Sequence, residues 1–318
     1  LPLLLLGRVA GGLGTSLLFS APEAWLISEH QRSGFAPNWL SQTFGLAYFG
    51  DSLVAIAAGQ LAGAAAAARG PVAPFELSVV FLALGALCVG ATWGENRGDA
   101  AATGDDDSNG GDQGPSGGTL IREAVQTLVS DRRVALVGAV QALFEGAMYV
   151  FVLQWVPALR ALLPGGFPTG KVFSCFMVAC MIGSSSFGAL MQRGAAPEGV
   201  MTGLLLAAAT AMGTATLAYR GALVAPLLAA FLAFEACVGC YFPLISTLRG
   251  KYLPDACRGV IMNLFGIPLN LIVVAVFLSL GRLGTVGALA CSASALVCAL
   301  GAMTALRLGG KPGRAEAA

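Results

Sequence analysis

The sequence predicts an all-α fold, a polytopic membrane bundle of about nine transmembrane helices. Of the 318 residues, 56% are hydrophobic and only 11% are charged, whereas soluble domains carry about 25% charged residues. Long apolar stretches recur along the whole chain. The 43 glycines supply small residues, which allow transmembrane helices to approach one another closely.

Nine stretches are long and apolar enough to cross a bilayer. A span needs about 20 mainly apolar residues, because each residue rises 1.5 Å and the hydrocarbon core is about 30 Å thick. The predicted spans are 2–28, 42–68, 72–93, 134–159, 172–192, 200–219, 222–247, 259–281 and 284–306. The first span lacks a basic region before its apolar run, so it does not resemble a cleavable signal peptide.

A polar segment at 94–133 separates three predicted spans from six. Its centre, GDDDSNGGDQGPSGG, is acidic, rich in Gly and low in complexity, which predicts disorder. Residues 120–131 alternate apolar and charged side chains and predict a short interfacial helix. We therefore divide the chain into three spans at 1–93, a linker at 94–133, six spans at 134–307 and a polar tail at 308–318.

The Lys and Arg residues indicate an orientation. The alternate loops that include the linker and the C-terminus hold twice as many of these residues as the loops on the other side. Cytoplasmic loops collect positive charge. We therefore expect the linker and the C-terminus to be cytoplasmic.

Charge and residue chemistry exclude several classes of function. A net charge of +1 offers no basic surface for nucleic acid. With His30 as the single histidine and no nucleophile and base in a recognisable pattern, we predict neither an enzyme nor a metal site nor a cofactor. Cys237 and Cys240 have C-x-x-C spacing inside an apolar span, so we favour buried structural thiols over a redox or metal pair.

Four acidic residues lie well inside predicted spans. They are Glu23, Asp51, Glu145 and Glu235. An ionisable group costs several kcal/mol in hydrocarbon and therefore usually faces a cavity or a partner. A poorly solvated carboxyl favours its neutral form, which suits Glu145 and Glu235 to carrying a proton.

Uncharged polar residues form stripes on two of the predicted helices. Gln141 and Tyr149 flank Glu145 at four-residue spacing, and Asn263 shares a helical face with Asn270. Such stripes indicate a wet pathway. The alternative is that they pair between helices, with a net contribution of about 1 kcal/mol each. For Gln141 and both asparagines neither interpretation is preferred, whereas for the two glutamates we favour the pathway.

The segment LRGKYLPDACRG carries three cationic residues on the side of the linker. They are Arg249, Lys251 and Arg258. The simpler interpretation is that they anchor two helix ends among the lipid headgroups, and the alternative is a conformational gate.

Four long runs carry a more specific signal. They are GRVAGGLGTSLLFSAPEAWLISEH, QALFEGAMYVFVLQWVPAL, KVFSCFMVACMIGSS and KYLPDACRGVIMNLFGIPLNLIVV. These runs closely resemble the eukaryotic molybdate-anion transporter family of the major facilitator superfamily. The resemblance extends from the first residues to about Leu306 and fails only in the linker.

The resemblance implies twelve helices in two six-helix halves joined by a cytoplasmic loop. Matching that loop to the linker implies that about nine of the twelve helices are present and that the chain is truncated at its N-terminus. Residues 188–194, GALMQRG, then resemble a degenerate copy of a superfamily loop motif that lacks its acidic residue. This makes Arg193 a candidate for gating or anchoring.

The resemblance also implies a function, the uptake of molybdate across the plasma membrane by alternating access. A dianion needs cations or neutral donors, so Gln141, Tyr149, Asn263 and Asn270 are candidate ligands. The glutamates would repel it and are expected to carry a coupling proton or to pair with cations, while the main cationic ligand could belong to the absent helices. The alternatives are transport of another oxyanion or a small metabolite, and a membrane sensor that transports nothing.

Overall fold

The computed structural model describes most of the chain. The described residues are 2–35, 37–94, 117–254 and 257–309. The centre of the linker and nearly all of the polar tail therefore lie outside the described residues, and so does the disorder predicted for the linker. The side chains of Glu23 and Arg258 are also outside the description, so their predicted roles stay predictions.

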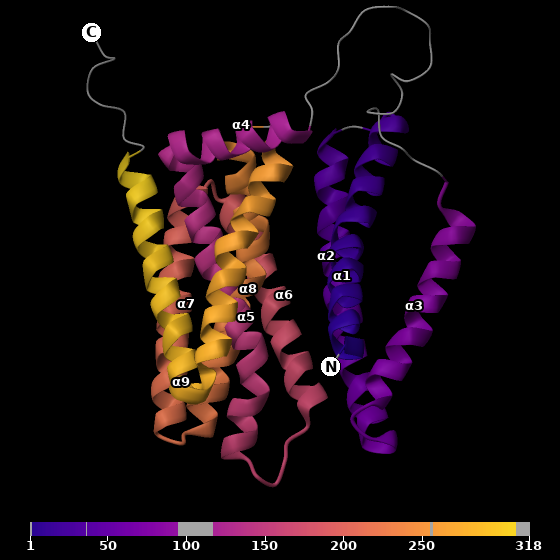
Figure 1. The fold of residues 1–318 in the computed structure, drawn as a ribbon, viewed down its shortest axis with the longest axis vertical. Coiled ribbons are helices and arrows are strands. Elements are labelled where there is room, and N and C mark those ends of the chain that lie inside the picture. Colours follow the sequence, from indigo (N-terminus) through magenta and orange to yellow (C-terminus); the bar gives the residue numbers. More distant parts are fainter. Residues whose placement is uncertain (1, 36, 95–116, 255–256, 310–318) are drawn as a thin grey trace, which may run out of the picture. The chain divides into compact units, whose positions relative to one another are not determined.

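Helices joined by short connections make up the described part of the chain, which contains no strand (Figure 1). The helices are α1 (Pro2–Arg32), α2 (Pro37–Arg69), α3 (Ala73–Thr92), α4 (Gly117–Ser130), α5 (Arg132–Leu162), α6 (Thr169–Gln192), α7 (Pro197–Arg220), α8 (Val224–Tyr252) and α9 (Arg258–Gly309). Each predicted span falls on one of them. The all-α prediction is confirmed.

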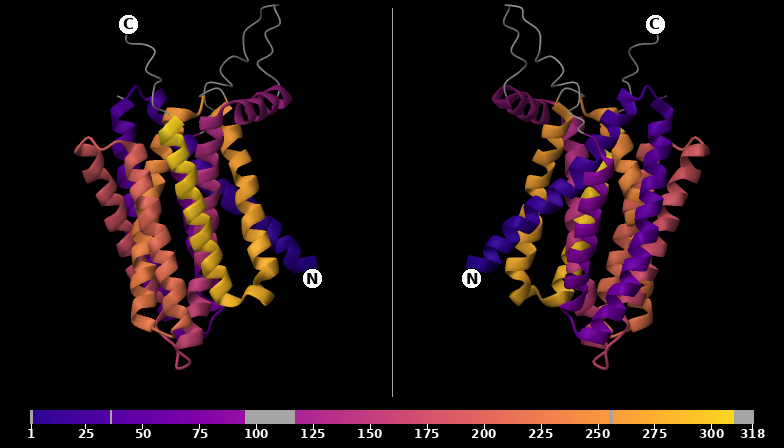
Figure 2. Two further views of the ribbon diagram at one scale, coloured as in Figure 1. Left: turned by 90° about the vertical axis from the view of Figure 1, so that its left-hand side faces the viewer. Right: turned by 90° about the vertical axis from the view of Figure 1, so that its right-hand side faces the viewer.

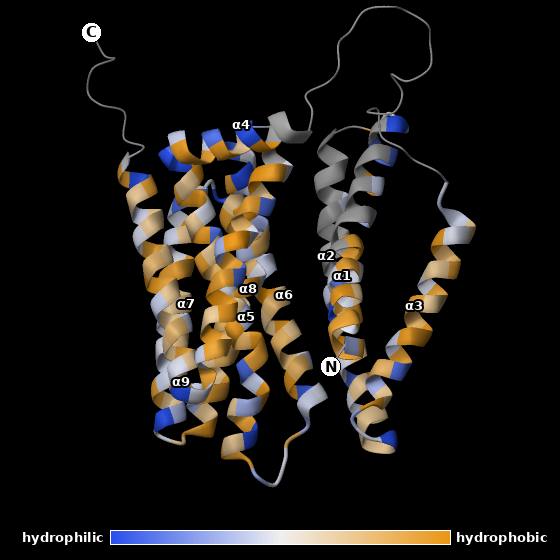
Figure 3. Cartoon of the chain, viewed as in Figure 1, coloured by the Kyte–Doolittle hydropathy of each residue, from blue (hydrophilic) through white to orange (hydrophobic). Residues whose placement is uncertain are grey.

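Seven helices, judged on their described residues alone, are long and apolar enough to cross a membrane. They are the part of α2 from Gly50 onward, α3, and α5 to α9. Figure 3 shows hydrophobic residues along most of the length of α5 to α9, and hydrophilic residues gathered near the helix ends. The chain is therefore a multi-pass integral membrane protein.

Helix α9 contains two spans rather than one. Gly284 interrupts it with φ 61° and ψ −175°, a conformation in the left-handed half of the map that glycine adopts without steric cost. The chain reverses direction there, as Figure 2 shows in the orange and yellow legs of α9. The two predicted spans 259–281 and 284–306 lie on either side of this reversal.

Helix α4 crosses the end of its neighbours instead of running alongside them (Figures 1 and 2). It lies where the sequence predicts a short helix. Ala124 is fully buried, whereas Ile121, Val125 and Val129 are exposed on an adjoining stripe. This arrangement fits a helix that lies along the membrane interface.

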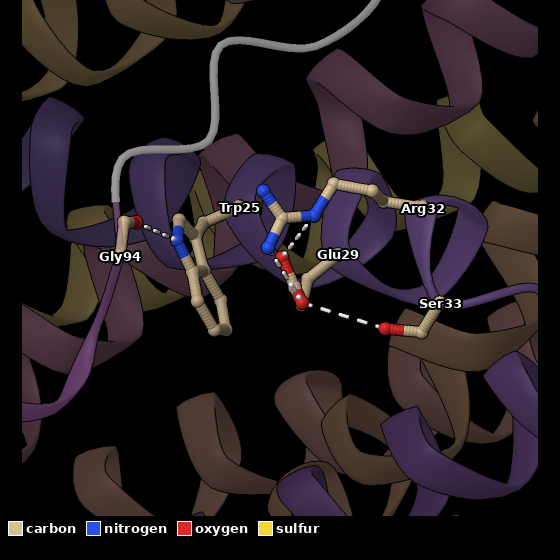
Figure 4. A network of polar contacts seen from close by, with 5 residues as sticks. All are labelled: Trp25, Glu29, Arg32, Ser33 and Gly94. Atoms are coloured by element: carbon tan, nitrogen blue, oxygen red, sulfur yellow. Dashed lines mark hydrogen bonds and ion pairs between the residues drawn. The ribbon is translucent and has the colours of Figure 1, made fainter.

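The chain divides into two compact units. Unit 1 comprises residues 1–51 and 68–112, and unit 2 comprises residues 52–67 and 113–318. In unit 1, Trp25 of α1 stacks on Trp93 with ring centroids 4.1 Å apart, and its indole N–H donates to the Gly94 carbonyl over 3.1 Å. Figure 4 shows the hydrogen bond from Trp25 to Gly94 beside the ion pair of Glu29 with Arg32. These contacts tie the end of α3 to α1.

Aromatic side chains form the centre of unit 2, between α5, α6 and α8. They are Phe144, Phe151, Phe176, Phe231, Phe234 and Tyr241, all fully or almost fully buried. Phe144 and Tyr241 stack with centroids 3.9 Å apart and planes inclined by 13°. Large rigid rings at this position hold α5 at a set distance from α8.

Two glycines bring α6 and α8 into backbone contact. A methyl group at Gly183 would overlap the Ala236 carbonyl, and one at Gly239 would overlap the Cys180 carbonyl. Small residues at such crossings are the usual means of close packing between membrane helices. The crossing fixes how α8 is rotated, and hence where its polar residues point.

Candidate functional site

A polar cluster joins α5 to α8 inside unit 2. The Nε group of Arg249 donates to the Gln141 side-chain carbonyl over 3.0 Å, and its Nη2 group donates to Oε1 of Glu145 over 3.3 Å. The Tyr241 hydroxyl donates to the same carboxylate oxygen over 3.0 Å. We call Gln141, Glu145, Tyr241 and Arg249 the central cluster.

Helical periodicity explains why these residues meet. Gln141 and Glu145 are one turn apart on α5, while Tyr241 and Arg249 are about two turns apart on one face of α8. Tyr241 is positioned by its stacking on Phe144, which precedes Glu145. The aromatic core thus sets the level at which α8 presents its polar groups to α5.

Arg249 reaches into the bundle although it lies near the end of α8. A long cationic side chain at a helix end usually extends toward the headgroups. Here the side chains of Arg249 and Glu145 are each only 16% exposed, and they form an ion pair. The cluster therefore places a positive charge among membrane helices and neutralises it with one carboxylate.

The guanidinium keeps donors to spare. Arginine has five N–H groups, and the central cluster engages Nε and Nη2. Among the described residues, Nη1 has no hydrogen-bond partner. The guanidinium thus has N–H groups beyond those that Gln141 and Glu145 engage.

The polar stripe on α5 reaches the surface of unit 2 at Tyr149, a residue that is 46% exposed. Tyr149 thus lies on the same face of α5 as Gln141 and Glu145, one turn beyond Glu145 and outside the central cluster. On α9, Asn263 and Asn270 are both exposed, and the Asn270 amide donates to the Gly266 carbonyl of its own helix over 2.7 Å. The structure does not bring the two asparagines into the central cluster.

Glu235 is the most buried carboxylate among the described residues, with 7% of the residue exposed. It lies on α8, more than three turns before Arg249, and does not join the central cluster. No hydrogen bond to its carboxyl group is found among the described residues.

A second polar group connects α7 to the end of α8. Lys251 Nζ lies 2.6 Å from Oε1 of Glu198, and the Tyr252 hydroxyl donates to the same oxygen over 2.8 Å. Lys251 is therefore paired within the protein, while Arg193 is exposed at the end of α6. Anchoring or gating by these residues stays a prediction.

Three members of these groups are not among the residues predicted from the sequence, namely Tyr241, Glu198 and Tyr252. Tyr241 belongs to a span that is apolar around it, although its spacing of eight residues from Arg249 places both on one helix face. Glu198 follows Pro197 at the start of α7, on the side of the membrane where α8 ends. Because consecutive spans run in opposite directions, the start of α7 and the end of α8 lie on the same side, which is the sequence signal for the pairing of Glu198 with Lys251.

Metal ligands do not cluster in the described part of the chain, where no three His, Cys, Asp or Glu side chains are grouped suitably. The eight cysteines, including Cys237 and Cys240, form no disulfide bond among the described residues. The chemistry that the arrangement offers is therefore ionic and hydrogen-bonding.

Comparison with known proteins identifies the family. A family model of the major facilitator superfamily, described as sugar transporters with 12 transmembrane segments, matches residues 1–241. The chain belongs to this family. The predicted fold class, a helix bundle of the major facilitator type, is thereby confirmed.

Individual relatives of this major facilitator protein carry a more specific name. Proteins named molybdate-anion transporter are 34% identical over 276 residues in Xenopus tropicalis and 33% identical over 303 residues in Takifugu rubripes. These alignments cover 85% and 90% of this chain, and 57% and 62% of the relatives. A relative of the same name in Danio rerio is 34% identical over 300 residues, covering 85% of this chain and 59% of its own length.

These relatives confirm the resemblance inferred from the four long runs. The chain spans about three fifths of the length of the curated relatives it matches.

Proposed function

We propose that this protein takes up molybdate into the cell by alternating access. The relatives named molybdate-anion transporter support the substrate, and the family supports the class of function. The observation that carries the proposal is the guanidinium of Arg249, which lies inside the bundle with donors to spare. A tetrahedral dianion needs such a cation in a poorly solvated site.

The central cluster offers the right kinds of ligand for an oxyanion. Arg249 supplies the positive charge, and its planar array of N–H groups can bind two oxygens at once. The Gln141 amide can donate further hydrogen bonds, whereas the single hydrogen of the Tyr241 hydroxyl is donated to Glu145. Tyr149, Asn263 and Asn270 are candidate donors along the route to the cluster, because they are exposed on unit 2.

Movement of a dianion into a cell is opposed by the membrane potential. Each elementary charge costs about 2.3 kcal/mol per 100 mV, so a dianion costs about twice that amount. Entry of protons with the anion would offset this cost. Glu145 and Glu235 are the candidate carriers, since both are carboxyls largely removed from water on membrane-spanning helices.

The topology belongs to the same proposal. Residues 1–93 form the remainder of one half and residues 134–307 the other, and alternating access is a rearrangement of these halves. The linker at 94–133, the C-terminal tail and Lys251 then lie on the cytoplasmic side of the plasma membrane, as the distribution of Lys and Arg indicates.

The description of the family favours a second candidate, a sugar or another small organic solute. Measuring uptake of molybdate, tungstate, sulfate and glucose in cells that express the full-length protein distinguishes the two. We expect molybdate accumulation that tungstate inhibits and that an Arg249→Ala variant, present at the membrane in equal amount, abolishes. Glucose uptake without molybdate uptake would establish the second candidate. A correctly localised protein without flux of any of these solutes would favour a sensor.

A further inference from the structure

Glu145 lies where an anionic ligand of Arg249 would bind. Its Oε1 atom accepts from Nη2 over 3.3 Å, which is longer than the 2.7–2.9 Å typical of a hydrogen bond between charged groups. A carboxylate and an oxyanion present the same chemistry to a guanidinium, namely negatively charged oxygens. An oxyanion therefore competes with Glu145 for the same cation.

Displacement would leave Glu145 without a cation. Among the described residues, the charged or titratable groups that face its carboxylate are Arg249 and Tyr241, both from α8. On its own helix the facing group is the neutral Gln141. Helix α9, which packs on the flanking turns of α5, presents Phe265 to Gly138 and Ile272 to Gly146.

The local environment therefore has no second positive charge for Glu145. A carboxylate that loses its partner in a poorly solvated interior becomes neutral by binding a proton. The displaced Glu145 would still accept or share a hydrogen bond with the Tyr241 hydroxyl, which holds it beside the site.

We propose that the transported oxyanion displaces Glu145 from Arg249 and that the displaced carboxylate takes up one proton. This inference rests on the proposed function and assigns to Glu145 the role of coupling a proton to the oxyanion. Hydronium from the side of the membrane to which the site is then open gives a proton to a carboxylate oxygen of Glu145 and becomes water. The cluster holds one positive and one negative charge before binding, and one cation, a neutral carboxyl and the dianion afterwards. When the anion leaves on the other side, the proton leaves and the ion pair forms again.

The Glu145→Gln variant of the full-length protein tests the coupling. An amide resembles the neutral carboxyl in shape and can accept from Tyr241, so anion binding should persist while proton coupling is lost. In vesicles, we expect accumulation of molybdate driven by a proton gradient to fall at least about tenfold more than the exchange of internal for external molybdate. Exchange by the variant should be independent of pH between about 5.5 and about 7.5, where the unmodified protein should respond.

A matched substitution controls for loss of a carboxyl elsewhere. Glu123 is exposed on α4, outside the central cluster, so Glu123→Gln should leave both accumulation and exchange unchanged. Accumulation by Glu145→Gln equal to that of the unmodified protein would overturn the inference, and so would loss of exchange in a variant that is folded and localised. If the unmodified protein neither accumulates nor exchanges molybdate, the proposed function fails instead.

A measurement on the unmodified protein does not depend on the folding of a variant. The purified full-length protein is placed in a weakly buffered solution, and the pH is followed as molybdate is added. We expect uptake of about one proton per bound anion. Binding of molybdate without any uptake of protons would overturn the inference.

Discussion

The guanidinium of Arg249 lies 3.3 Å from the carboxylate of Glu145, and the two residues come from different membrane-spanning helices. Each is charged and largely excluded from water, so each depends on the other. Removing one partner of a buried pair leaves an uncompensated charge, whereas removing both does not.

Stability measurements on variants of this pair should show that dependence. We expect Arg249→Ala to lower the free energy of unfolding by about 3 kcal/mol, because Glu145 stays buried without its cation. Adding Glu145→Gln should restore most of the loss. Thermal unfolding of the purified protein in detergent measures both. Equal stability of the single and double variants would show that the ion pair is not what the first substitution disrupts.

Tyr241 contributes a hydrogen bond and a ring, and the two can be separated. Tyr241→Phe removes the hydroxyl that donates to Glu145 but keeps the stacking on Phe144. We expect a loss of about 1 kcal/mol from the hydrogen bond. Tyr241→Ala also removes the fully buried ring and should cost about 3–5 kcal/mol. If the two variants unfold at the same temperature, the stacking does not position the central cluster.

The close crossing of α6 and α8 is testable with two glycines of one helix. Gly183→Ala places a methyl group against the Ala236 carbonyl, whereas Gly188 has open space around it. We expect Gly183→Ala to destabilise the protein by at least about 2 kcal/mol because the helices must move apart. Gly188→Ala should be neutral or slightly stabilising, since alanine favours the helix. Similar amounts of folded protein from both variants would contradict the crossing.

The reversal within α9 depends on the backbone of Gly284. Its φ of 61° with ψ of −175° is a conformation that other residues rarely adopt, and a methyl group on its Cα would meet no other atom within 4 Å. Gly284→Ala should therefore cost about 1–3 kcal/mol through backbone strain alone. Gly281→Ala, three residues earlier in helical backbone with equal space, is the control. Thermal unfolding of the two variants at the same temperature would mean that the reversal tolerates a side chain.

Sequence reasoning locates the membrane spans well because hydrocarbon imposes one simple rule. A span must be apolar and about 20 residues long, so composition alone marks it, and even the two spans of α9 are separable on either side of Gly284. The helical face shared by Gln141 and Glu145 is also predictable, because the period of an α-helix is constant.

The direction of Arg249 is not predictable in this way. Near a helix end, its long side chain can extend outward to headgroups or inward to a partner. The choice depends on how α8 is rotated against α5, which the crossing at Gly183 and Gly239 and the stack of Phe144 on Tyr241 determine. Those contacts join residues far apart in the chain.

The sequence by itself thus determined that this is a helical membrane protein, where its helices run, and that carboxylates lie within them, because each of these follows from hydropathy and helical period. Only the tertiary structure decided that Glu145 is paired with Arg249 while Glu235 stays outside the central cluster. The physical reason is that a charge in hydrocarbon must be compensated, and the rotation and depth of neighbouring helices determine which group can reach it.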